Sequence, residues 1–436
     1  MTRVALTTLG CKVNQYESAE IIEGLKNRGF SIVPFDSEAD IYIINTCTVT
    51  EKTDYQSRQL VRRAHRGNPS AMIVATGCYA QTAPEKLASL PGMKMVVGTA
   101  EKNEIPRLLE NISGYGRKTI VSDVASLKES LLPVSLSHFP GHTRAFLKIQ
   151  DGCDSFCSYC IIPYARGRSR SLPEDAVISQ IKRFTASNYL EIVLTGIHLG
   201  LYGHDFEPQT SLIKLLKRIE NLGITGRLRI SSIEPAEITD DIISHISDSE
   251  IMCRHLHVPL QSGDDKILKA MKRNYTSRQF RNIIEKICIA IPKIAIGIDV
   301  MVGFPGEGEK EFNNTRDFLN SIPLAYLHVF PYSRRLGTDA AELPGQVQMI
   351  VKKARAKELR ILGMEKRNIF NKRFIGETLP VLAEKGNDPR LLKGYSDNYI
   401  PFIIEGGHSS IVNRIVDIRA NGAVCNALTG RIKANV

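Results

Sequence analysis

Between residues 145 and 330 the sequence alternates six times between a short apolar run and a longer amphipathic stretch. The apolar runs cover residues 145–150, 191–195, 228–233, 255–260, 296–302 and 326–330, and the helical patterns cover 174–187, 211–221, 237–247, 277–290 and 309–320. Successive parallel strands joined by helices wind right-handed, so this order predicts an α/β barrel. Six units are fewer than the eight of a closed barrel, and we therefore expect a partial (βα)6 barrel.

The regions on either side follow other patterns. From residue 4 to about 109, strand-like runs at 4–9, 41–45 and 72–75 alternate with helical patterns, which predicts an open parallel α/β sheet. A polar stretch around 111–141 indicates a linker. After residue 371, short alternating segments and the Asn421-Gly422 pair predict a tight hairpin and a small all-β barrel. We expect three domains, at 1–115, 139–370 and 371–436.

Composition limits the cellular context. The chain has 436 residues, of which 43% are hydrophobic, enough for several packed cores. Because no signal peptide and no apolar run of membrane-spanning length are seen, we expect a cytoplasmic protein whose nine cysteines stay reduced. The net charge of +11 favours a polyanionic partner.

Three cysteines, Cys153, Cys157 and Cys160, follow the first barrel strand without a fourth cysteine nearby. Barrel enzymes place their chemistry at the carboxyl ends of the strands, which is where these thiols are expected. Their spacing lets three thiolates bind one iron–sulfur cubane and leaves one iron open for an exchangeable ligand. The alternatives are a zinc site completed by a distant residue such as His142 or Cys253, and three unrelated thiols.

Three more cysteines occupy equivalent positions in the first region. Cys11, Cys47 and Cys78 each come just after a predicted parallel strand, at the edge where open α/β sheets bind ligands. Any one of them alone is more simply a small buried hydrophobic residue. Three at equivalent positions indicate a second cluster, again with three protein ligands and one open iron.

The motif at residues 153–160 resembles the CxxxCxxC signature of the radical S-adenosylmethionine superfamily, with an aromatic residue, Tyr159, before the last cysteine. The resemblance implies a 4Fe-4S cluster whose open iron is chelated by the amino and carboxylate groups of S-adenosylmethionine. It also implies reductive cleavage of that cofactor to a 5′-deoxyadenosyl radical, while the protein supplies binding, electrostatics and exclusion of water.

The whole chain resembles the methylthiotransferase family, which joins an N-terminal cluster domain, a radical barrel and a C-terminal TRAM barrel. The stretches most similar to its MtaB subgroup are LGCKVNQYES (9–18), NTCTVT (45–50), GCYAQ (77–81), GFPGE (303–307) and GYSDNY (394–399). That subgroup modifies N6-threonylcarbamoyladenosine at position 37 of tRNA.

The resemblance implies two 4Fe-4S clusters and two uses of S-adenosylmethionine. Sulfur on the cluster of Cys11, Cys47 and Cys78 would be methylated. The radical produced at the other cluster would take hydrogen from carbon 2 of the adenine, and the methylated sulfur would attach to that carbon. The implied partners are the tRNA anticodon loop, an electron donor and a sulfur source, with no membrane and a monomeric protein. The adenine must leave its stack, at a small cost in a single-stranded loop.

Residues that support the cofactor are expected after the second, third and fourth barrel strands. The superfamily's usual GlyGlyGlu is replaced by ThrGlyIle at 195–197, so the ligand of the amino group is not assigned. Glu234 and Gln261 are the polar candidates for S-adenosylmethionine, and Tyr159 is the candidate for its adenine. Each also has the plainer interpretation of a strand-end or turn residue.

Several other residues receive an interpretation. Arg166, Arg168 and Arg170, directly after the cysteine loop, are interpreted as contacts to tRNA phosphates. The arginines between 58 and 66 and the cations of 352–373 suit either RNA or a solvated helix face. The residues assigned to packing are Cys253, Cys288 and Cys425. His198 and His257 are interpreted as satisfied barrel histidines rather than ligands.

Other functions stay open on the sequence alone. A methylthiotransferase could act instead on isopentenyladenosine in tRNA or on an aspartate of a ribosomal protein. A non-catalytic, metal-containing RNA-binding protein would explain the charge and the small barrel, but it predicts zinc and no cleavage of S-adenosylmethionine. An iron–sulfur electron carrier would explain both cysteine trios, but it predicts four protein ligands per cluster.

Overall fold

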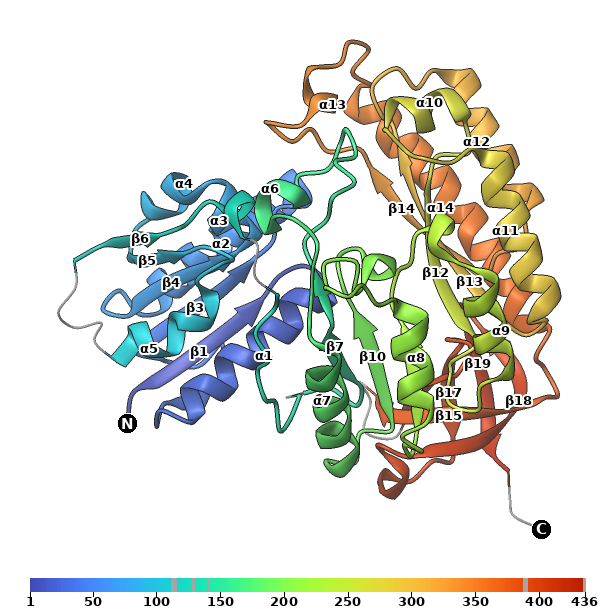
Figure 1. The fold of residues 1–436 in the computed structure, drawn as a ribbon, viewed down its shortest axis with the longest axis horizontal. Helices are drawn as coiled ribbons and strands as arrows, with labels where there is room; N and C mark the ends of the chain where they lie inside the picture. Colours follow the sequence, from blue (N-terminus) through green and yellow to red (C-terminus); the bar gives the residue numbers. More distant parts are fainter. Residues whose placement is uncertain (111–115, 128–129, 140, 387–390, 434–436) are drawn as a thin grey trace.

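The computed structural model of this chain describes residues 1–110, 116–127, 130–139, 141–386 and 391–433. Figure 1 shows three parts in chain order: a sheet flanked by helices, a curved set of parallel strands backed by helices, and a small barrel near the C-terminus. The expected mixed α/β class is confirmed. None of the helices in these described ranges is long and apolar enough to cross a membrane.

The N-terminal sheet is parallel, as predicted. In sheet order its strands are β2 (Ser31–Val33), β1 (Arg3–Thr8), β3 (Ile41–Thr46), β4 (Met72–Gly77), β5 (Met93–Val97) and β6 (Lys118–Ile120). The helices around it are α1 (Lys12–Lys26), α2 (Glu51–Gly67), α3 (Cys78–Thr82), α4 (Pro84–Ala88) and α5 (Ile105–Glu110). Every residue of β3 is buried, as expected for a central strand covered on both faces.

The stretch expected to be a linker, residues 111–141, is largely attached to its neighbours. β6 pairs with β5, so the first sheet extends into it. Farther along, the backbone of Leu136 exchanges hydrogen bonds of 3.0 and 2.8 Å with the side chain of Gln180 in the barrel. Residues 111–115, 128–129 and 140 of this stretch lie outside the described residues. The domain limits themselves stay a prediction.

The second part is a partial barrel of six parallel strands, which confirms the expectation. The strands are β7 (Ala145–Lys148), β10 (Glu191–Thr195), β11 (Arg227–Ile230), β12 (His255–Gln261), β13 (Ala295–Val302) and β14 (Tyr326–Pro331). They form two three-stranded sheets, and single bridges such as Ser232 to His257 join β11 to β12. The main helices outside are α7 (Glu174–Ala186), α8 (Leu212–Glu220), α9 (Asp240–Asp248), α11 (Ser277–Ala290), α12 (Glu309–Ser321) and α14 (Met349–Lys372).

Side chains alternate between the two faces of these strands. On β12, Leu256 and Val258 join the apolar core shared with Phe280 of α11. The alternate residues, His255 and His257, point to the opposite face, the inside of the barrel. The apolar positions therefore hold the helices on, and the interior of the barrel is free to carry polar groups.

The third part is a closed five-stranded barrel, as predicted. Around the barrel the strands are β15 (Thr378–Lys385), β16 (Leu392–Ser396), β17 (Pro401–Glu405), β19 (Ala427–Ile432) and β18 (Ile415–Val424). It is consistent with a TRAM-like domain. Its core clusters with Phe370 and Phe374 at the end of α14, which connects it to the partial barrel.

The predicted hairpin turn at Asn421-Gly422 is wrong. β18 runs through both residues, and the chain turns at Cys425 and Asn426, where Cys425 has the positive φ of 51° that a tight turn needs. Asn421 lies instead at a bulge in β18, where its side chain accepts a 2.8 Å hydrogen bond from Thr429. Bulges and tight turns favour the same residue types, which explains the error.

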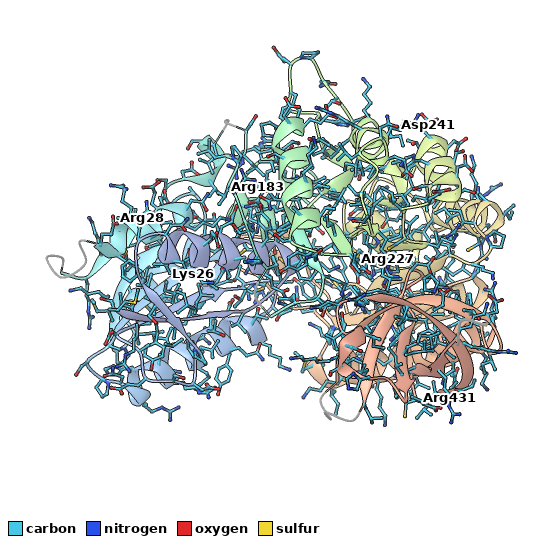
Figure 2. The ribbon with its side chains drawn as sticks, turned by 90° about the horizontal axis from the view of Figure 1, so that it is seen from below. Lys26, Arg28, Arg183, Arg227, Asp241 and Arg431 are labelled. Carbon is cyan, nitrogen blue, oxygen red and sulfur yellow. The ribbon has the colours of Figure 1, made fainter. Side chains whose placement is uncertain are left out.

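The loop between β16 and β17 inserts under the partial barrel. Arg229 donates to the carbonyl oxygen of Asp397 at 3.0 Å, and Arg227 donates to that of Tyr395 at 2.7 Å. Both guanidiniums also bond the buried carboxylate of Glu191, at 2.8 and 2.7 Å. Figure 2 shows Arg227 where the partial barrel meets the C-terminal barrel. Buried ion pairs thus anchor the small barrel to the amino ends of β10 and β11.

We expect Glu191→Gln to lower the free energy of unfolding at neutral pH by about 3 kcal/mol, because it leaves two buried guanidiniums without a countercharge. Burial opposes ionisation of Glu191, but Arg229 and Arg227 lower its pKa from 4.5 to about 2. Its stabilising effect is therefore complete above about pH 4.5 and is lost as the pH falls towards 2.

Urea unfolding of wild type and variant at about pH 7 and about pH 3 checks this. The difference in free energy of unfolding between the two proteins should be smaller at the lower pH. Glu285→Gln, on the exposed face of α11, is the matched control and should leave stability within about 0.5 kcal/mol. A difference that does not change with pH would contradict the assignment of the charge to Glu191.

The N-terminal domain spans the open side of the partial barrel. At one edge α1 lies along β7, and Lys148 of β7 bonds Glu17 of α1 at 3.2 Å. At the other edge Arg335, beyond β14, donates to Asp54 of α2 at 2.6 Å and to Thr48 at 2.7 Å. The domain therefore contacts both rims of the opening that six strands leave.

Candidate active site

Cys11, Cys47 and Cys78 lie at the carboxyl ends of three neighbouring strands, β1, β3 and β4. Cys11 directly precedes α1, Cys47 follows β3, and Cys78 is the first residue of α3. Neighbouring parallel strands end at one edge, so thiols distant in the sequence come together there. Burial raises the pKa of both Cys47 and Cys78, and the thiols are close enough for the charge of Cys11 to raise it further.

Two glycines allow this convergence. Gly10 and Gly77, each directly before a cysteine, have φ of +101° and +92°, a backbone conformation that favours glycine. A Cβ on Gly10 would lie 2.9 Å from the Cβ of Cys47, and one on Gly77 would lie 2.4 Å from the carbonyl oxygen of Thr46. Any side chain at either position would push the cysteine loops apart.

Polar residues of the same motifs fix the loops. Asn14 donates to the carbonyl oxygens of Leu9 at 2.8 Å and Thr46 at 3.0 Å, so it joins the loops of Cys11 and Cys47. Asn45 donates to the carbonyl oxygen of Asn14 at 2.9 Å. The hydroxyl of Thr46 donates at 2.6 Å to Thr76, beside the loop of Cys78. The three loops are therefore held as one unit.

Cys153, Cys157 and Cys160 lie on the loop between β8 (Gln150–Asp151) and α6 (Ile162–Arg166). This loop follows β7, at the carboxyl end of the partial barrel. All three thiols are half-buried. Arg273 donates to the Sγ of Cys157 at 3.4 Å, and the Nδ1 of His198 lies 3.3 Å from the Sγ of Cys153.

The ionisation of these thiols depends on burial and on their cationic neighbours. Burial raises the pKa of both Cys78 and Cys160 to about 12. Burial also opposes ionisation of Cys153, but its hydrogen bond with His198 lowers its pKa overall. Thiols of high pKa become thiolates when a metal binds them, because coordination displaces the proton. Both trios therefore suit metal coordination better than chemistry as free nucleophiles.

The sulfurs of the two trios do not form a compact site for a single zinc ion. Among the described residues, only His257, Asp299 and His328 form a group of three potential ligands whose ligand atoms all lie within 4.8 Å of one another. The sulfurs of neither trio are that close, whereas one tetrahedral zinc would hold them about 3.8 Å apart. A cubane spreads its ligand sulfurs, because each binds a different iron.

The residues suggested for completing a zinc site lie elsewhere. Cys253 is buried near Arg229, at the opposite end of the barrel strands. His142 packs its ring against Phe139 and Phe146. Cys253 is a packed core residue, as predicted. Cys425 is exposed in the hairpin turn, so its assignment to packing is wrong.

Two of the three residues expected to bind S-adenosylmethionine lie beside the cysteine loop. Tyr159 belongs to that loop, and Glu234 accepts a hydrogen bond from Arg273, the residue that also reaches Cys157. Gln261 ends β12 next to a bulge, with φ of 68°. It lies at the same end of the barrel, without a contact to the trio in the described part of the chain. The roles of all three in cofactor binding stay predictions.

Sequence reasoning missed two neighbours of this trio. Arg273 lies in no recognisable sequence motif. Its contacts with Glu234 and Cys157 join residues that are far apart in the sequence, so no local pattern indicates them. His198 was expected to be a satisfied barrel histidine, and it is satisfied, but by Cys153 on one side and Glu237 on the other. Against the effect of burial, these two hydrogen bonds raise the pKa of His198 to about 10.

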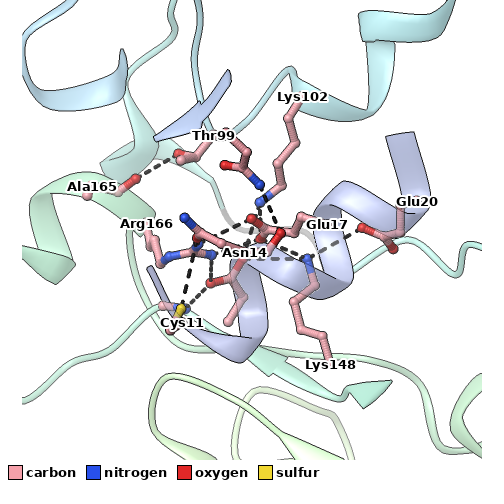
Figure 3. Close-up of polar contacts among 12 residues, drawn as sticks. Cys11, Asn14, Glu17, Glu20, Thr99, Lys102, Lys148, Ala165 and Arg166 are labelled. Carbon is pink, nitrogen blue, oxygen red and sulfur yellow. Dashed lines mark hydrogen bonds and ion pairs between the residues drawn. The ribbon is translucent and has the colours of Figure 1, made fainter. Parts of the chain in front are cut away.

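The interpretation of Arg166 as a phosphate contact is wrong, because its side chain is 1% exposed. Figure 3 shows it between the two domains, where it donates to Glu17 and Asp151 at 2.8 Å each and to the side chain of Asn14. Asp151 lies two residues before Cys153, and Asn14 lies three after Cys11. Arg166 thus connects the two cysteine loops.

Two buried lysines complete this ion network. Lys102 and Lys148 both contact Glu17. Although burial opposes ionisation, Arg166 and the two lysines hold the pKa of Glu17 well below its usual range and lower that of Asp151 to about 2. Glu17 and Asp151 therefore stay ionised at neutral pH, and the network fixes α1 against the start of the partial barrel.

The other basic residues divide into structural and exposed ones. In α14, Lys352 donates to the carbonyl oxygen of Tyr332 at 3.1 Å, and Arg355 pairs with the buried Glu307 of the GFPGE motif at 2.8 Å. These two anchor the helix and are not available to RNA. Arg168 is exposed beside the cysteine loop. The exposed cations of α2 and α14 are Lys52, Arg62, Arg63, Arg66, Lys353, Lys357, Arg360 and Lys372.

Comparisons with known proteins agree with this arrangement. A model of the uncharacterized protein family UPF0004 matches residues 3–98, and a model of the radical SAM superfamily matches residues 147–319. The structure of the radical S-adenosylmethionine methyltransferase TsrM from Kitasatospora setae, with cobalamin and a 4Fe-4S cluster bound, has a TM-score of 0.58 at 16% identity, over 78% of this chain and 77% of that one. That likeness concerns the fold.

Two curated relatives match along nearly the whole chain. The threonylcarbamoyladenosine tRNA methylthiotransferase MtaB of Bacillus subtilis is 40% identical over 428 residues, covering 96% of this chain and 94% of its own. The tRNA-2-methylthio-N(6)-dimethylallyladenosine synthase of Carboxydothermus hydrogenoformans is 32% identical over 424 residues, covering 95% of each.

The partial barrel, with its CxxxCxxC trio after the first strand, defines a radical S-adenosylmethionine enzyme. Such an enzyme uses S-adenosylmethionine and a 4Fe-4S cluster. Within that class the chain belongs to the methylthiotransferase family, in its MtaB subgroup.

Proposed function

We propose that this enzyme transfers a methylthio group to carbon 2 of N6-threonylcarbamoyladenosine at position 37 of tRNA, using two 4Fe-4S clusters and S-adenosylmethionine. One observation carries the proposal: a second cysteine trio, at the ends of β1, β3 and β4, is held against the first by buried ion pairs. The name of the 40% identical relative supports the nucleoside, and the dimethylallyladenosine synthase is less similar at 32%.

Each part of the site has a role in this proposal. Cys153, Cys157 and Cys160 hold the cluster that supplies the electron for reductive cleavage of the cofactor, and Cys11, Cys47 and Cys78 hold the one that supplies sulfur. Tyr159, Glu234 and Gln261 bind S-adenosylmethionine. Arg273 and His198 orient and stabilise the first trio through their contacts with Cys157 and Cys153.

The proposed partners are the tRNA anticodon loop, an electron donor and a sulfur source. Exposed cations such as Arg168, Arg62 and Lys353 supply contacts to phosphates, and the target adenine leaves its stack to reach the site between the two trios. We further propose that the enzyme acts as a cytoplasmic monomer.

We expect the anaerobically reconstituted enzyme, given dithionite and S-adenosylmethionine, to form the 2-methylthio derivative of threonylcarbamoyladenosine in tRNA from a strain that lacks the activity. Mass spectrometry of the digested nucleosides detects it, and tRNA without the threonylcarbamoyl group is the control. Formation of 5′-deoxyadenosine without that nucleoside would contradict the substrate. Failure to form 5′-deoxyadenosine would contradict the use of the first trio.

A further inference from the structure

Three ionisable side chains from neighbouring strands meet inside the partial barrel. His257 of β12 places its Nε2 2.8 Å from Oδ1 of Asp299 on β13, and His328 of β14 places its Nδ1 3.3 Å from the same oxygen. With Tyr326 and His255, these residues form what we call the interior polar cluster. None of its members has a role in the proposed handling of the two clusters.

Within the interior polar cluster, one ring nitrogen of His328 is left without a hydrogen-bond partner in the described part of the chain. The hydroxyl of Tyr326 bonds His255 at 2.8 Å and His257 at 3.2 Å, so both ring nitrogens of His257 are satisfied. His328 differs, because its side chain is 51% exposed and its Nε2 has no partner in the described part of the chain. Although burial opposes ionisation, hydrogen bonds from His257 and His328 hold the pKa of Asp299 well below its usual range.

The interior polar cluster lies below the cysteine loop. Asp299 and Met301 share one face of β13, about 6.6 Å apart along the strand. Met301 and Tyr159 of that loop both pack against one apolar cluster, which includes Phe304. On the other side, the ring of Tyr399, from the inserted loop of the C-terminal barrel, lies 4.7 Å from that of His255. The cluster thus sits between the first trio above and the inserted loop below.

A second basic side chain comes from the N-terminal domain. Lys12 directly follows Cys11 and lies within electrostatic reach of His255 and Tyr399. Within the described residues it has no hydrogen-bond or ion-pair partner. Burial lowers the pKa of Lys12. The barrel interior therefore also receives the amino group of Lys12, from beside the cysteine trio of the N-terminal domain.

These groups suit one of the two nucleosides named by the relatives. A threonylcarbamoyl group carries a carboxylate and a hydroxyl, whereas a dimethylallyl group is a hydrocarbon. Imidazole and ammonium donors stabilise a carboxylate, and they would be left desolvated and unpaired against a hydrocarbon. In adenine, carbon 2 and the carbon that bears N6 are separated by one ring nitrogen. A base with carbon 2 between the trios therefore directs its N6 substituent away from them.

We propose that His328, positioned by Asp299, binds the carboxylate of the threonylcarbamoyl group of the target adenosine, with the amino group of Lys12 as a second donor. The inference rests on the proposed function and specifies how the enzyme selects its nucleoside. His257, itself bonded by the hydroxyl of Tyr326, holds Asp299 in place, so that the open nitrogen of His328 faces the substrate.

The test compares two anticodon stem-loop RNAs, one with threonylcarbamoyladenosine and one with its methyl ester, which has the same shape without the charge. His328→Phe should lower kcat/KM on the acid RNA by about 10- to 100-fold, because it removes one charge-assisted hydrogen bond. It should leave kcat/KM on the ester RNA unchanged. His328→Lys should retain most activity on the acid RNA. His204→Phe, at an exposed histidine in a loop, is the matched control and should change neither.

Cleavage of S-adenosylmethionine without RNA should be equal in wild type and His328→Phe. Equal losses on both RNAs, or no loss on either, would overturn the inference. The inference would also be overturned if each chain bound one equivalent of a non-iron divalent metal that is lost in His328→Phe. His257, Asp299 and His328 would then form a metal site. Failure of the proposed function would instead show in the wild-type enzyme, as no methylthiolated product from the acid RNA.

Discussion

Cys78→Ala should abolish methylthiolation of tRNA while reductive cleavage of S-adenosylmethionine to 5′-deoxyadenosine continues, whereas Cys157→Ala should abolish both. The reason is the division between the two trios, since Cys78 starts α3 on the N-terminal sheet and Cys157 lies on the loop that follows β7. Iron content should fall from about eight to about four atoms per chain in either variant.

Chromatographic measurement of 5′-deoxyadenosine and of methylthiolated nucleoside in the same reaction separates the two effects. Cys288→Ala, at a half-buried cysteine outside both trios, is the control and should retain both products and the full iron content. Loss of 5′-deoxyadenosine in Cys78→Ala would mean that the two trios do not work separately. Unchanged iron in that variant would rule out Cys78 as a ligand.

Arg166→Ala should lower the free energy of unfolding by about 3–5 kcal/mol and reduce methylthiolation. The substitution removes the guanidinium that Glu17 and Asp151 share and leaves two buried carboxylates with weaker compensation. Because these carboxylates lie on opposite sides of the domain contact, the two cysteine loops also lose their common fixed point. Arg166→Lys should have an intermediate effect, since it keeps the charge but not the two-pronged geometry.

Urea unfolding and methylthiolation measured on the same samples check this. Arg168→Ala is the matched control two residues away. Arg168 is exposed, pairs with the surface residue Asp154 and lies over the ring of Phe156. The substitution should leave stability within about 0.5 kcal/mol and weaken tRNA binding mildly. A larger stability loss in Arg168→Ala than in Arg166→Ala would contradict the division into a buried and an exposed arginine.

Most of the architecture was predictable because it depends on patterns local in the sequence. The six barrel strands are buried, so they appear as apolar runs between amphipathic helices, and the structure places a strand at each. β2 and β6 have three residues each, too few to show a pattern. The hairpin turn was misplaced, because the residues that suit a turn also suit the bulge at Asn421.

In the candidate site, the sequence predicted the cysteines but not the residues that contact them. The cysteines stand out because each follows a strand, but their partners come from distant parts of the chain. Arg166 seemed uncompensated because Glu17 is 149 residues away, and Arg273 is 116 residues from Cys157. One usable signal existed: Asn14 and Glu17 are three residues apart in α1, so they share a helix face, and that face is buried.

The attachment of the N-terminal domain at both rims of the barrel limits how this protein can be recombined with its relatives. A chimera that exchanges residues 1–110 brings a new Glu17 and Asp54 against the old Arg166, Lys148 and Arg335. An exchange of domains will keep substrate preference only when the partners of these buried ion pairs are exchanged together. The N-terminal domain and the partial barrel should therefore be exchanged as a pair.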